Sequence, residues 1–528
     1  MNLLVSASSA LLTAAAAADL WQVFARDLMM FQQNSYRNER YARWFQQSGE
    51  STNLGRIFCC VGLFMMLVNS IPALFGVWLS TIIVIWQCVV LARRKYKKPL
   101  VWTSRARRIF GVSWLLALIP VVAAPFVFGP FGIGGALLAV LILSPLFMLA
   151  ANVVLRPVEK RINKRYYDEA AAILASMPDL KIIGITGSYG KTSTKHYLNR
   201  ILQEHFSTMM TPGSFNTPMG VIRTVREHLR PYDEVFICEM GAKQVGDIKE
   251  ICDLVHPHMG IVTAVGEQHL ESFKTIENVQ RTKFELVDAL PADGLAVVNN
   301  DFPKVADREV GNVECVRYAV AQPDGADFVA GDIEYSPDGT RFTITDKKSG
   351  ESLTLQTRLV GECNISNLMA AVIVAKRLGV PDDKIRYAVG QIEQVEHRLT
   401  VKRVPSGMTI IDDAFNSNPM GSRMALEVLG RMTSGKRIVV TPGMIELGDR
   451  QFAANEELGR IAAKNADVAI VVGEYNREAL LAGLAAGPIA PGNVHAVATF
   501  AEAQAKLRAI GRPGDIVLYE NDLPDTFK

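Results

Sequence analysis

Two long stretches of this 528-residue sequence lack charge: residues 57–92 and residues 109–155 contain no Asp, Glu, Lys or Arg. A helix on the surface of a soluble protein has a polar face, so the absence of charge argues against a soluble helical core here. Each stretch is too long for one membrane span of about 20 residues and has room for two. Turn residues interrupt each stretch near its middle, at 69–72 and 128–132. We therefore expect two helical hairpins in a bilayer.

Residues 1–18 also lack charge and are rich in alanine. A signal peptide would have basic residues before its apolar segment, and this segment has none. We expect a weak first span or an interfacial helix instead, which gives four or five spans in all. Residues 31–45 are amphipathic and aromatic, so we expect them to lie along the membrane surface.

The seven cysteines lack the paired spacing of a metal site or a disulfide framework: Cys59 and Cys60 are adjacent and the others are scattered. This usage suits a reduced cytosolic compartment. The net charge is only +3, but acids are missing from the basic segments 93–98 and 105–108, and five basic residues lie within 156–165. The positive-inside rule puts these segments in the cytosol. Basic residues beside membrane spans set topology or contact anionic lipid, so we expect no nucleic-acid partner.

A strand, a glycine turn and a helix are predicted in succession after residue 180. The apolar run 181–185 leads into Thr186-Gly-Ser-Tyr-Gly-Lys-Thr192, and a helical pattern follows. Glycines let backbone N–H groups converge on a phosphate, and the helix N-terminus adds positive potential. One glycine of the general P-loop pattern is missing, because Ile185 stands five residues before Gly190. The alternative is a turn between strand and helix in which Gly-Lys-Thr occurs by chance.

The P-loop interpretation assigns a role to each polar residue of the turn. Lys191 would reach the β- and γ-phosphates of ATP, and the Thr192 hydroxyl would ligate Mg²⁺. The remaining nucleotide-binding candidates are Gly187, Ser188, Gly190 and Ser193.

Apolar strands alternate with amphipathic helices beyond this loop, which predicts a parallel α/β sheet. Glu239 and His269 follow two successive strands, and ligands gather at the carboxyl ends of such strands. An acid and a neutral imidazole suit Mg²⁺ or the orientation of Mg²⁺-bound water; the alternative is two solvated loop residues. Residues 327–360 have turn signals at 337–339 and 348–350 and predict a β-hairpin excursion.

Asn364 and Asn367 stand three residues apart at a predicted helix start, so they share one face of that helix. Their amides can cap the helix or bond the edge of a purine.

The Thr-Gly-Ser-x-Gly-Lys-Thr form, with Glu239 and His269 behind it, resembles the Mur ligase family of ATP-dependent enzymes that join a carboxylate to an amine. The sequence motifs are most similar to those of the D-alanyl-D-alanine-adding (MurF-type) members, over roughly residues 181–528. The resemblance implies that Glu239 and His269 serve Mg²⁺ and that Asn216 and Thr217 contact the acceptor substrate. It also implies a carbamylated Lys283 that supports a second Mg²⁺, with a surface helix lysine as the alternative.

The resemblance extends to adenine and to the C-terminal part. It assigns Asn364 and Asn367 to adenine, although Cys363 stands where the family often has histidine. It places Arg398 near the γ-phosphate, Asp413 at the ribose and Asn416 at the substrate. Phe415 inherits no role, because the family often has a polar residue there. We expect the strand-end segment 442–448 to face the incoming amine.

The expected fold is an α-helical membrane domain (residues 1–155), a basic linker helix (156–180), a P-loop central α/β domain (181–396) and a Rossmann-like C-terminal domain (397–528). Family members normally begin with a soluble domain that grips UDP, and here the membrane domain takes its place.

The expected function is an ATP- and Mg²⁺-dependent, ADP-forming ligase that acts through an acyl phosphate. It would add D-alanyl-D-alanine or a similar amino compound to a muramyl-peptide precursor in peptidoglycan biosynthesis, with the precursor UDP-linked or lipid-linked. We expect a multi-pass protein of the cytoplasmic membrane with its catalytic domains in the cytosol, and other cell-wall enzymes as candidate partners. Two alternatives stay open: a ligase that builds another membrane-associated polymer such as poly-γ-glutamate, and an ATP-binding scaffold without ligase activity.

Overall fold

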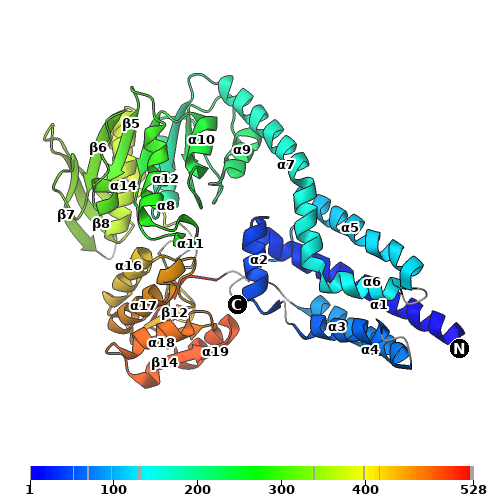
Figure 1. Ribbon diagram of the computed structural model, residues 1–528. Coiled ribbons are helices and arrows are strands. Elements are labelled where there is room, and N and C mark those ends of the chain that lie inside the picture. The colour runs from blue at the N-terminus through cyan, green and yellow to red at the C-terminus, as the bar shows by residue number, and fades with distance from the viewer. Residues whose placement is uncertain are drawn as a thin grey trace. The chain divides into compact units, whose positions relative to one another are not determined.

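The computed structural model describes residues 2–50, 53–67, 71–94, 96, 98–128, 132–336, 339–395, 399–414 and 417–523. The chain divides into two compact units, one built on Met1–Lys164 and one comprising Arg165–Asp522, and each is described by itself (Figure 1). Several sequence predictions lie outside the described residues: the turn positions 69–70, 129–131 and 337–338, and the residues Arg398, Phe415 and Asn416.

Over its described residues, the first unit consists of helices joined by turns and short irregular segments. Its helices are α1 (Asn2–Gln33), α2 (Asn38–Gln47), α3 (Leu54–Leu67), α4 (Ile71–Arg93), α5 (Ser104–Phe128), α6 (Gly132–Ile142) and α7 (Ser144–Ala175). Two described segments, Phe75–Arg93 and Ser104–Phe126, are long and apolar enough to cross a membrane. The pair α6–α7 adds a third candidate only if it counts as one span bent by 76°.

The described helices provide two or three candidate spans, fewer than the four or five expected from the sequence. Helix α3 has 14 residues, and a helix of that length rises about 21 Å, less than the roughly 30 Å hydrocarbon core. The second expected hairpin is bent between α6 and α7, where Arg56 Nη1 donates to the Ile142 carbonyl at 3.0 Å and Ser144 Oγ donates to Asp27 Oδ2 at 2.6 Å. Arg56 thus bonds a backbone carbonyl at the bend. In a continuous helix that carbonyl would instead bond an N–H group of the next turn.

Three aromatic residues of segment 31–45 are buried inside the helical unit, and the placement of this segment along a membrane surface stays a prediction. Phe31 and Tyr41 are fully buried and Trp44 is 8% exposed. The Phe31 and Tyr41 rings pack edge to face with centroids 5.2 Å apart. Such edge-to-face pairs are typical of packed cores.

Helix α7 is continuous from Ser144 to Ala175 and includes Pro157. Residues 156–175 therefore extend the last apolar helix, and the expected boundary between membrane domain and linker helix falls inside this element. The helix ends at Ala175, before Pro178 and five residues short of the end of the expected linker helix (156–180).

The central domain of the second unit is an α/β sheet with its first strands parallel, as predicted. Over the described residues the strand order is β2-β3-β1-β4-β5-β6-β7-β8-β9. The strands are β1 (Lys181–Thr186), β2 (Thr208–Met210), β3 (Val235–Glu239), β4 (Met259–Val262), β5 (Leu295–Asn299), β6 (Glu314–Ala319), β7 (Phe328–Ser336), β8 (Gly339–Asp346) and β9 (Ser352–Thr357). The helices are α8 (Lys191–Leu202), α9 (Pro218–Glu227), α10 (Asp247–Val255), α11 (Leu270–Phe273), α12 (Ile276–Asp288), α13 (Pro303–Ala306), α14 (Glu362–Arg377) and α15 (Asp382–Gly390).

Strand β1 lies between β3 and β4, and it pairs with both in parallel. Ile185 near its end is in register with Glu239 on β3 and Ile261 on β4. The loops that follow these three strands therefore emerge side by side at the carboxyl edge of the sheet, where ligands bind in such folds.

Helices cover both faces of the parallel part of the sheet (Figure 1). On β3, Val235 and Ile237 belong to the cluster that contains residues of α8 and α14. The alternate residues Phe236 and Cys238 belong to the cluster formed with α9, α10 and α12. Burial on both faces explains the continuous apolar runs that identified these strands in the sequence.

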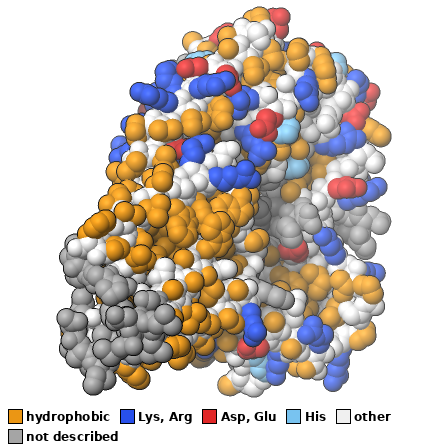
Figure 2. Space-filling model, turned by 90° about the vertical axis from the view of Figure 1, so that its right-hand side faces the viewer, with side chains coloured by type: hydrophobic (Ala, Val, Ile, Leu, Met, Phe, Trp, Pro, Cys, Tyr) orange, Lys and Arg blue, Asp and Glu red, His pale blue; other side chains and the backbone are white. Residues whose placement is uncertain are grey.

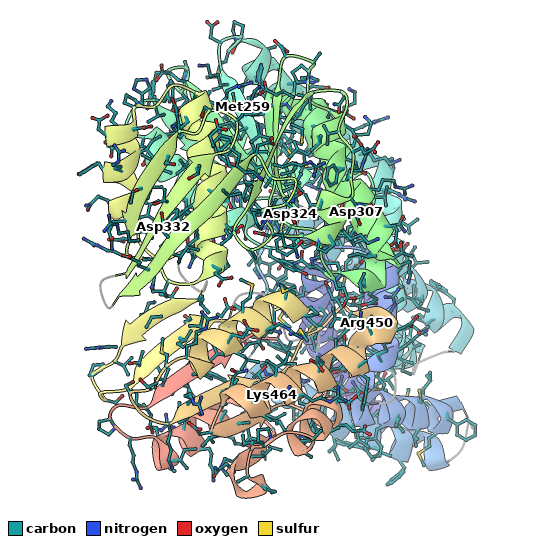
Figure 3. The ribbon with its side chains drawn as sticks, turned by 90° about the vertical axis from the view of Figure 1, so that its left-hand side faces the viewer. Met259, Asp307, Asp324, Asp332, Arg450 and Lys464 are labelled. Atoms are coloured by element: carbon teal, nitrogen blue, oxygen red, sulfur yellow. The ribbon has the colours of Figure 1, made fainter. Side chains whose placement is uncertain are left out.

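Strands β7, β8 and β9 form the predicted hairpin excursion and pair antiparallel at the end of the sheet. The β7–β8 register shifts between Gly331 and Glu334, and Asp332 within this bulge has a φ of 50° (Figure 3). The turn at 348–350, between β8 and β9, is where the sequence predicted it.

The C-terminal domain is a second α/β sheet, ordered β10-β11-β15-β12-β13-β14 over its described residues. Only β10 and β11 are antiparallel; the other pairs are parallel. The elements are β10 (Thr400–Arg403), β11 (Thr409–Asp413), α16 (Pro419–Gly430), β12 (Arg437–Thr441), the 3₁₀ helix η3 (Gly448–Arg450), α17 (Gln451–Asn465), β13 (Val468–Val472), α18 (Arg477–Ala485), η4 (Pro491–Asn493), β14 (Val494–Val497), α19 (Phe500–Ile510) and β15 (Ile516–Glu520). This confirms that the C-terminal domain is α/β, as the sequence predicted.

Candidate functional site

The predicted phosphate loop lies between β1 and α8, where it was expected. Gly187 and Gly190 have φ values of 150° and 78°, which favour glycine. A Cβ on Gly187 would lie 2.0 Å from Thr263 Oγ1, and a Cβ on Gly190 would lie 2.3 Å from Asn367 Oδ1. Both glycines are therefore required by backbone conformation and by close packing.

Hydrogen bonds of Ser188 help to hold the loop against the segment after β4. Ser188 N donates to the Ala264 carbonyl at 2.8 Å, and Ser188 Oγ donates to the Gly266 carbonyl at 3.0 Å. Within the loop, Lys191 Nζ donates to the Gly187 carbonyl at 2.5 Å, so the ammonium lies over the turn that would hold phosphates. Ser193 follows in α8 and is buried.

Glu239, at the end of β3, is buried and meets the start of α8. Thr192 Oγ1 lies 3.1 Å from Glu239 Oε1, so the predicted hydroxyl and carboxylate ligands of Mg²⁺ are adjacent. Burial alone would raise the Glu239 pKa, but the ammonium groups of Lys195 and Lys191 and the Asn216 amide hold it below its ordinary value. Glu239 is therefore an ionised carboxylate at neutral pH.

Residues 211–217, which we call the acceptor loop, also reach Glu239. Asn216 Nδ2 donates to Glu239 Oε1 at 3.0 Å, and Gly241 N donates to the Asn216 carbonyl at 2.7 Å. A Cβ on Gly241 would lie 2.8 Å from Asn216 Cγ, so glycine is required there. Thr217 caps α9 by accepting a hydrogen bond from Gly220 N.

His269 lies in the loop after β4 and contacts the C-terminal domain. Its Nδ1 is hydrogen-bonded to Glu446 Oε2, and Glu271 N donates to the Glu446 carbonyl at 3.2 Å. Burial lowers the His269 pKa, although the Glu446 carboxylate acts in the opposite direction. A neutral ring that donates from Nδ1 leaves Nε2 available to a metal or a water.

Lys283 is a buried residue of α12, and not the surface lysine of the alternative interpretation. Burial, followed by the nearby charge of Lys191, holds the Lys283 pKa well below its usual range. A lowered pKa favours the neutral, nucleophilic form of a lysine amine.

Asn364 and Asn367 lie in the first turns of α14 and face α8. Tyr197 Oη donates to Asn364 Oδ1 at 2.8 Å, and Thr194 Oγ1 donates to Asn367 Oδ1 at 3.2 Å. The structure thus brings the asparagine motif against the helix of the phosphate loop. Their contact with adenine stays a prediction.

In the C-terminal domain, Asp413 ends β11 and accepts a hydrogen bond from Leu399 N at 3.1 Å. Arg450, labelled in Figure 3, forms an ion pair with Glu267 of the central domain. The segment after β12 contains Glu446, with a φ of 63°, which places its carboxylate on His269. Arg398 and Asn416 cannot be assigned here, since both lie outside the described residues.

The donor set around Glu239 fits Mg²⁺, which prefers oxygen ligands and usually takes one or two from protein while phosphates and waters complete its shell. Thr192 and Glu239 supply such oxygens. Over the described residues there is no group of three or more His, Cys, Asp or Glu side chains that could hold a metal by themselves.

Two residues of this site were missed in the sequence. Lys195 is fully buried and pairs with Glu239, and Glu446 contacts His269. The spacing of Lys191 and Lys195, one helical turn apart, was a usable signal for the first. Glu446 was not singled out; the sequence predicted only that segment 442–448 faces the incoming amine.

Comparisons with known proteins agree with this geometry. The Mur ligase middle domain matches residues 185–375, and the Mur ligase glutamate ligase domain matches residues 397–519. The UDP-N-acetylmuramoyl-tripeptide–D-alanyl-D-alanine ligase of Mycobacterium tuberculosis is 32% identical over 361 residues, 64% of this chain and 70% of that protein. The Bacillus subtilis protein of the same name is 27% identical over 282 residues, 53% of this chain and 60% of that protein.

A solved structure shares the fold and carries a nucleotide. The MurF ligase of Thermotoga maritima in complex with ADP is 25% identical, with a TM-score of 0.60 over 68% of this chain and 80% of that chain.

Proposed function

Because the chain belongs to the Mur ligase family of ATP-dependent amide-bond ligases, we propose that it joins D-alanyl-D-alanine or a similar amine to the free carboxylate of a muramyl-peptide precursor. The relatives named above carry this activity in their names. The observation that carries the proposal is that the phosphate loop and the acceptor loop meet at one carboxylate. Thr192 and Asn216 both contact Glu239 Oε1, at 3.1 and 3.0 Å.

The proposed reaction has two steps. A carboxylate oxygen of the precursor attacks the γ-phosphorus of ATP, and ADP leaves. The amine then attacks the carbonyl carbon of the acyl phosphate, the C–O bond to phosphate breaks, and the amine loses a proton. Water must be kept out of the site between the two steps, because it would hydrolyse the acyl phosphate before the amine attacks.

The residues at the phosphate loop would supply charge and position. The Lys191 ammonium, now on the Gly187 carbonyl, would stabilise negative charge on the transferring phosphoryl group. Thr192 and Glu239 would hold Mg²⁺, which when bound neutralises phosphate charge. His269 would present Nε2 while Glu446 holds Nδ1, and Asn216 and Thr217 would place the precursor.

We place the remaining predicted residues in the same scheme. Asn364 and Asn367 would bond adenine, Asp413 the ribose, Arg398 the γ-phosphate region and Asn416 the substrate. Lys283 would carry a carbamate, because a neutral buried amine can add CO₂.

Membrane attachment is part of the proposal. The two apolar helices α4 and α5 expose large hydrophobic side chains, and Figure 2 shows a broad area of such side chains with Lys and Arg nearby. The most exposed of these residues include Phe75, Ile82, Trp86, Leu115, Ile119, Val122 and Phe126. Exposed apolar surface of this extent fits lipid. The basic residues of 93–98 and 105–108 would then lie on the cytosolic side, with the catalytic domains.

Product formation by the full chain in detergent tests the function. The protein would receive ATP, Mg²⁺, D-alanyl-D-alanine and either UDP-muramyl tripeptide or its lipid-linked counterpart, with ADP and amide product identified by mass. We expect product with at least one precursor, and a loss of kcat of roughly 10²–10³-fold in Lys191→Ala, the scale of removing one charge-stabilising donor. Lys347→Ala, which changes an exposed lysine, is the matched control. ADP release without amide product would favour an ATP-binding scaffold instead.

A further inference from the structure

Lys195 is a fully buried lysine whose ammonium contacts three oxygens. Its Nζ donates to the Thr211 carbonyl at 2.8 Å and to the Gly213 carbonyl at 2.6 Å. It also lies 3.0 Å from Glu239 Oε2. Two of the three N–H donors of the ammonium therefore have carbonyl acceptors, and the contact with Glu239 is an ion pair.

The three oxygens come from two different parts of the site. Thr211 and Gly213 belong to the acceptor loop, and Glu239 ends β3. Lys195 itself is one turn beyond Lys191 on α8, on the same side of that helix. One rigid helix thus carries the phosphate-loop lysine, the Thr192 hydroxyl and the ammonium that fastens the acceptor loop.

We propose that Lys195 is a positioning residue that fixes the acceptor loop on Glu239 and so sets where the precursor carboxylate lies relative to the transferring phosphoryl group. The proposal rests on the proposed function for the identity of the acceptor. Lys195 touches neither ATP nor precursor in this role: it acts through the backbone of the loop that carries Asn216.

Energetics argue for a role beyond stability. A buried ion pair is weak as a stabilising device, because desolvation offsets most of the attraction, and an apolar residue of similar volume often does as well. Lys195 differs from a simple pair because two of its three contacts are hydrogen bonds to loop carbonyls. A loop held only by a charge pair with Glu239 would not need them, whereas a loop that must be placed to a fraction of an ångström does.

Steady-state kinetics of the full chain test the proposal. Lys195→Met keeps an unbranched apolar side chain that ends one atom short of Nζ, and it removes the charge. We expect KM for the precursor to rise at least about tenfold while KM for ATP changes less than about twofold. Lys249→Met, which breaks an exposed ion pair with Asp253, is the matched control and should change neither. An unchanged precursor KM, or an equal rise in both KM values, would overturn the proposal.

A second comparison removes the risk that Lys195→Met leaves Glu239 as an unpaired buried charge and fails to fold. Glu239→Gln alone and Glu239→Gln with Lys195→Met are compared for precursor binding by calorimetry. If Lys195 only neutralises Glu239, the added substitution leaves precursor binding unchanged, which contradicts the proposal. If it fastens the loop carbonyls, the double variant binds at least about fivefold more weakly.

Hydrogen exchange separates failure of this proposal from failure of the proposed function. Backbone amides of residues 213–217 should exchange at least about tenfold faster in Lys195→Met than in the unsubstituted chain, with those of α10 unchanged. This readout needs no acceptor. Faster exchange without amide product from the unsubstituted chain would reject the proposed function and keep the loop assignment, and unchanged exchange would reject the loop assignment itself.

Discussion

Burial and a neighbouring lysine both lower the pKa of a lysine amine, and Lys283 is in this position on α12. Burial penalises the ammonium form, and the charge of Lys191 adds to the penalty. The neutral form of the amine would attack CO₂ and lose a proton to solvent, which leaves a carbamate anion with two oxygens. Such a group would suit Mg²⁺ better than any lysine does.

Replacement of Lys283 by alanine should lower kcat by about 100-fold or more, because the oxygens that the carbamate supplies would be lost. Formate or acetate should restore part of the activity by occupying the vacated space. Turnover with and without these anions measures both effects, with Lys347→Ala as control. Full activity of the alanine variant, or equal rescue by chloride, would contradict carbamylation.

The motif residues were predictable one by one, because the short spacing between them along the sequence is enough to identify a phosphate-binding loop. Gly187, Gly190 and Thr192 follow an apolar strand and open a helix, so the sequence places them at a phosphate site without knowledge of the rest of the fold. Lys195 was not predicted as a site residue, because its partners lie 16 to 44 positions away and meet it only when β2 and β3 are in place. Burial of a charged side chain is a property of packing, which local spacing does not contain.

Contacts between elements set the geometry of His269. The loop before α11 and the segment after β12 are joined through the His269–Glu446 hydrogen bond and the Arg450–Glu267 ion pair. A carboxylate on Nδ1 fixes the tautomer and the direction of the ring, which is the usual way that proteins orient a catalytic or metal-binding imidazole.

Removal of this carboxylate in Glu446→Ala should lower kcat by roughly 10–100-fold with the fold intact, the scale known for such orienting partners. Glu446→Gln keeps a hydrogen-bond acceptor for Nδ1 and should lose less. Measurement of kcat for both variants, with exposed Glu474→Ala as control, checks that Glu446→Gln loses less activity than Glu446→Ala. Equal activity of Glu446→Ala and the unsubstituted chain would show that His269 needs no orientation from the C-terminal domain.

A second polar contact ties three elements of the C-terminal domain together. Glu520, at the end of β15, is buried and accepts hydrogen bonds from Ser422 at 2.6 Å and Thr441 at 2.8 Å, and also from Ser417. Burial raises the Glu520 pKa even though these hydroxyls lower it in part. The folded state therefore binds a proton here more tightly than the unfolded state does.

Stability should consequently depend on pH in a defined direction. A raised folded pKa gives a contribution that is complete below the unfolded pKa of about 4.3 and is lost as pH rises through the folded pKa. Glu520→Gln cannot titrate, so its midpoint temperature relative to the unsubstituted chain should increase between pH 4.5 and pH 8. Thermal unfolding at several pH values measures the difference, and exposed Glu478→Gln should show none. An opposite trend would mean that the hydroxyl groups outweigh burial.

Strands of the second unit could be predicted from the sequence more closely than the helix ends of the first unit. Strand β1 (Lys181–Thr186) agrees to within a residue with the predicted run 181–185, because an apolar run that leads into a glycine turn marks it. The bend between α6 and α7 was not predicted at its observed place. It coincides with contacts of Arg56 and Asp27, which are more than 80 residues away in the sequence. An apolar run reveals that helices are present but not where a distant side chain interrupts them.

Across the whole molecule, exposed apolar side chains concentrate in the helical unit and the site residues lie in the second unit. Every described candidate for chemistry, from Gly187 to Asp413, belongs to the unit Arg165–Asp522. The helical unit supplies α4 and α5, whose length and composition suit a membrane. Chemistry and attachment are therefore separable in principle.

A version that starts at Arg165 tests this separation. It keeps Tyr166, Tyr167 and Ala170, which pack in the core of the central domain. We expect the full chain to float with lipid vesicles after alkaline extraction and the shortened version to stay in solution, because several apolar helices hold a protein in lipid far more firmly than one acyl chain does.

Kinetics with the two forms of the precursor then show what attachment contributes. Confinement to the surface raises the effective concentration of a lipid-linked precursor but not of a soluble one. We expect the shortened version to keep kcat/KM for UDP-muramyl tripeptide within about threefold and to lose at least about 100-fold with the lipid-linked form in vesicles. An equal ratio for both forms would mean that the helices only tether the enzyme. A loss with the soluble precursor as well would mean that the helical unit contributes to the site itself.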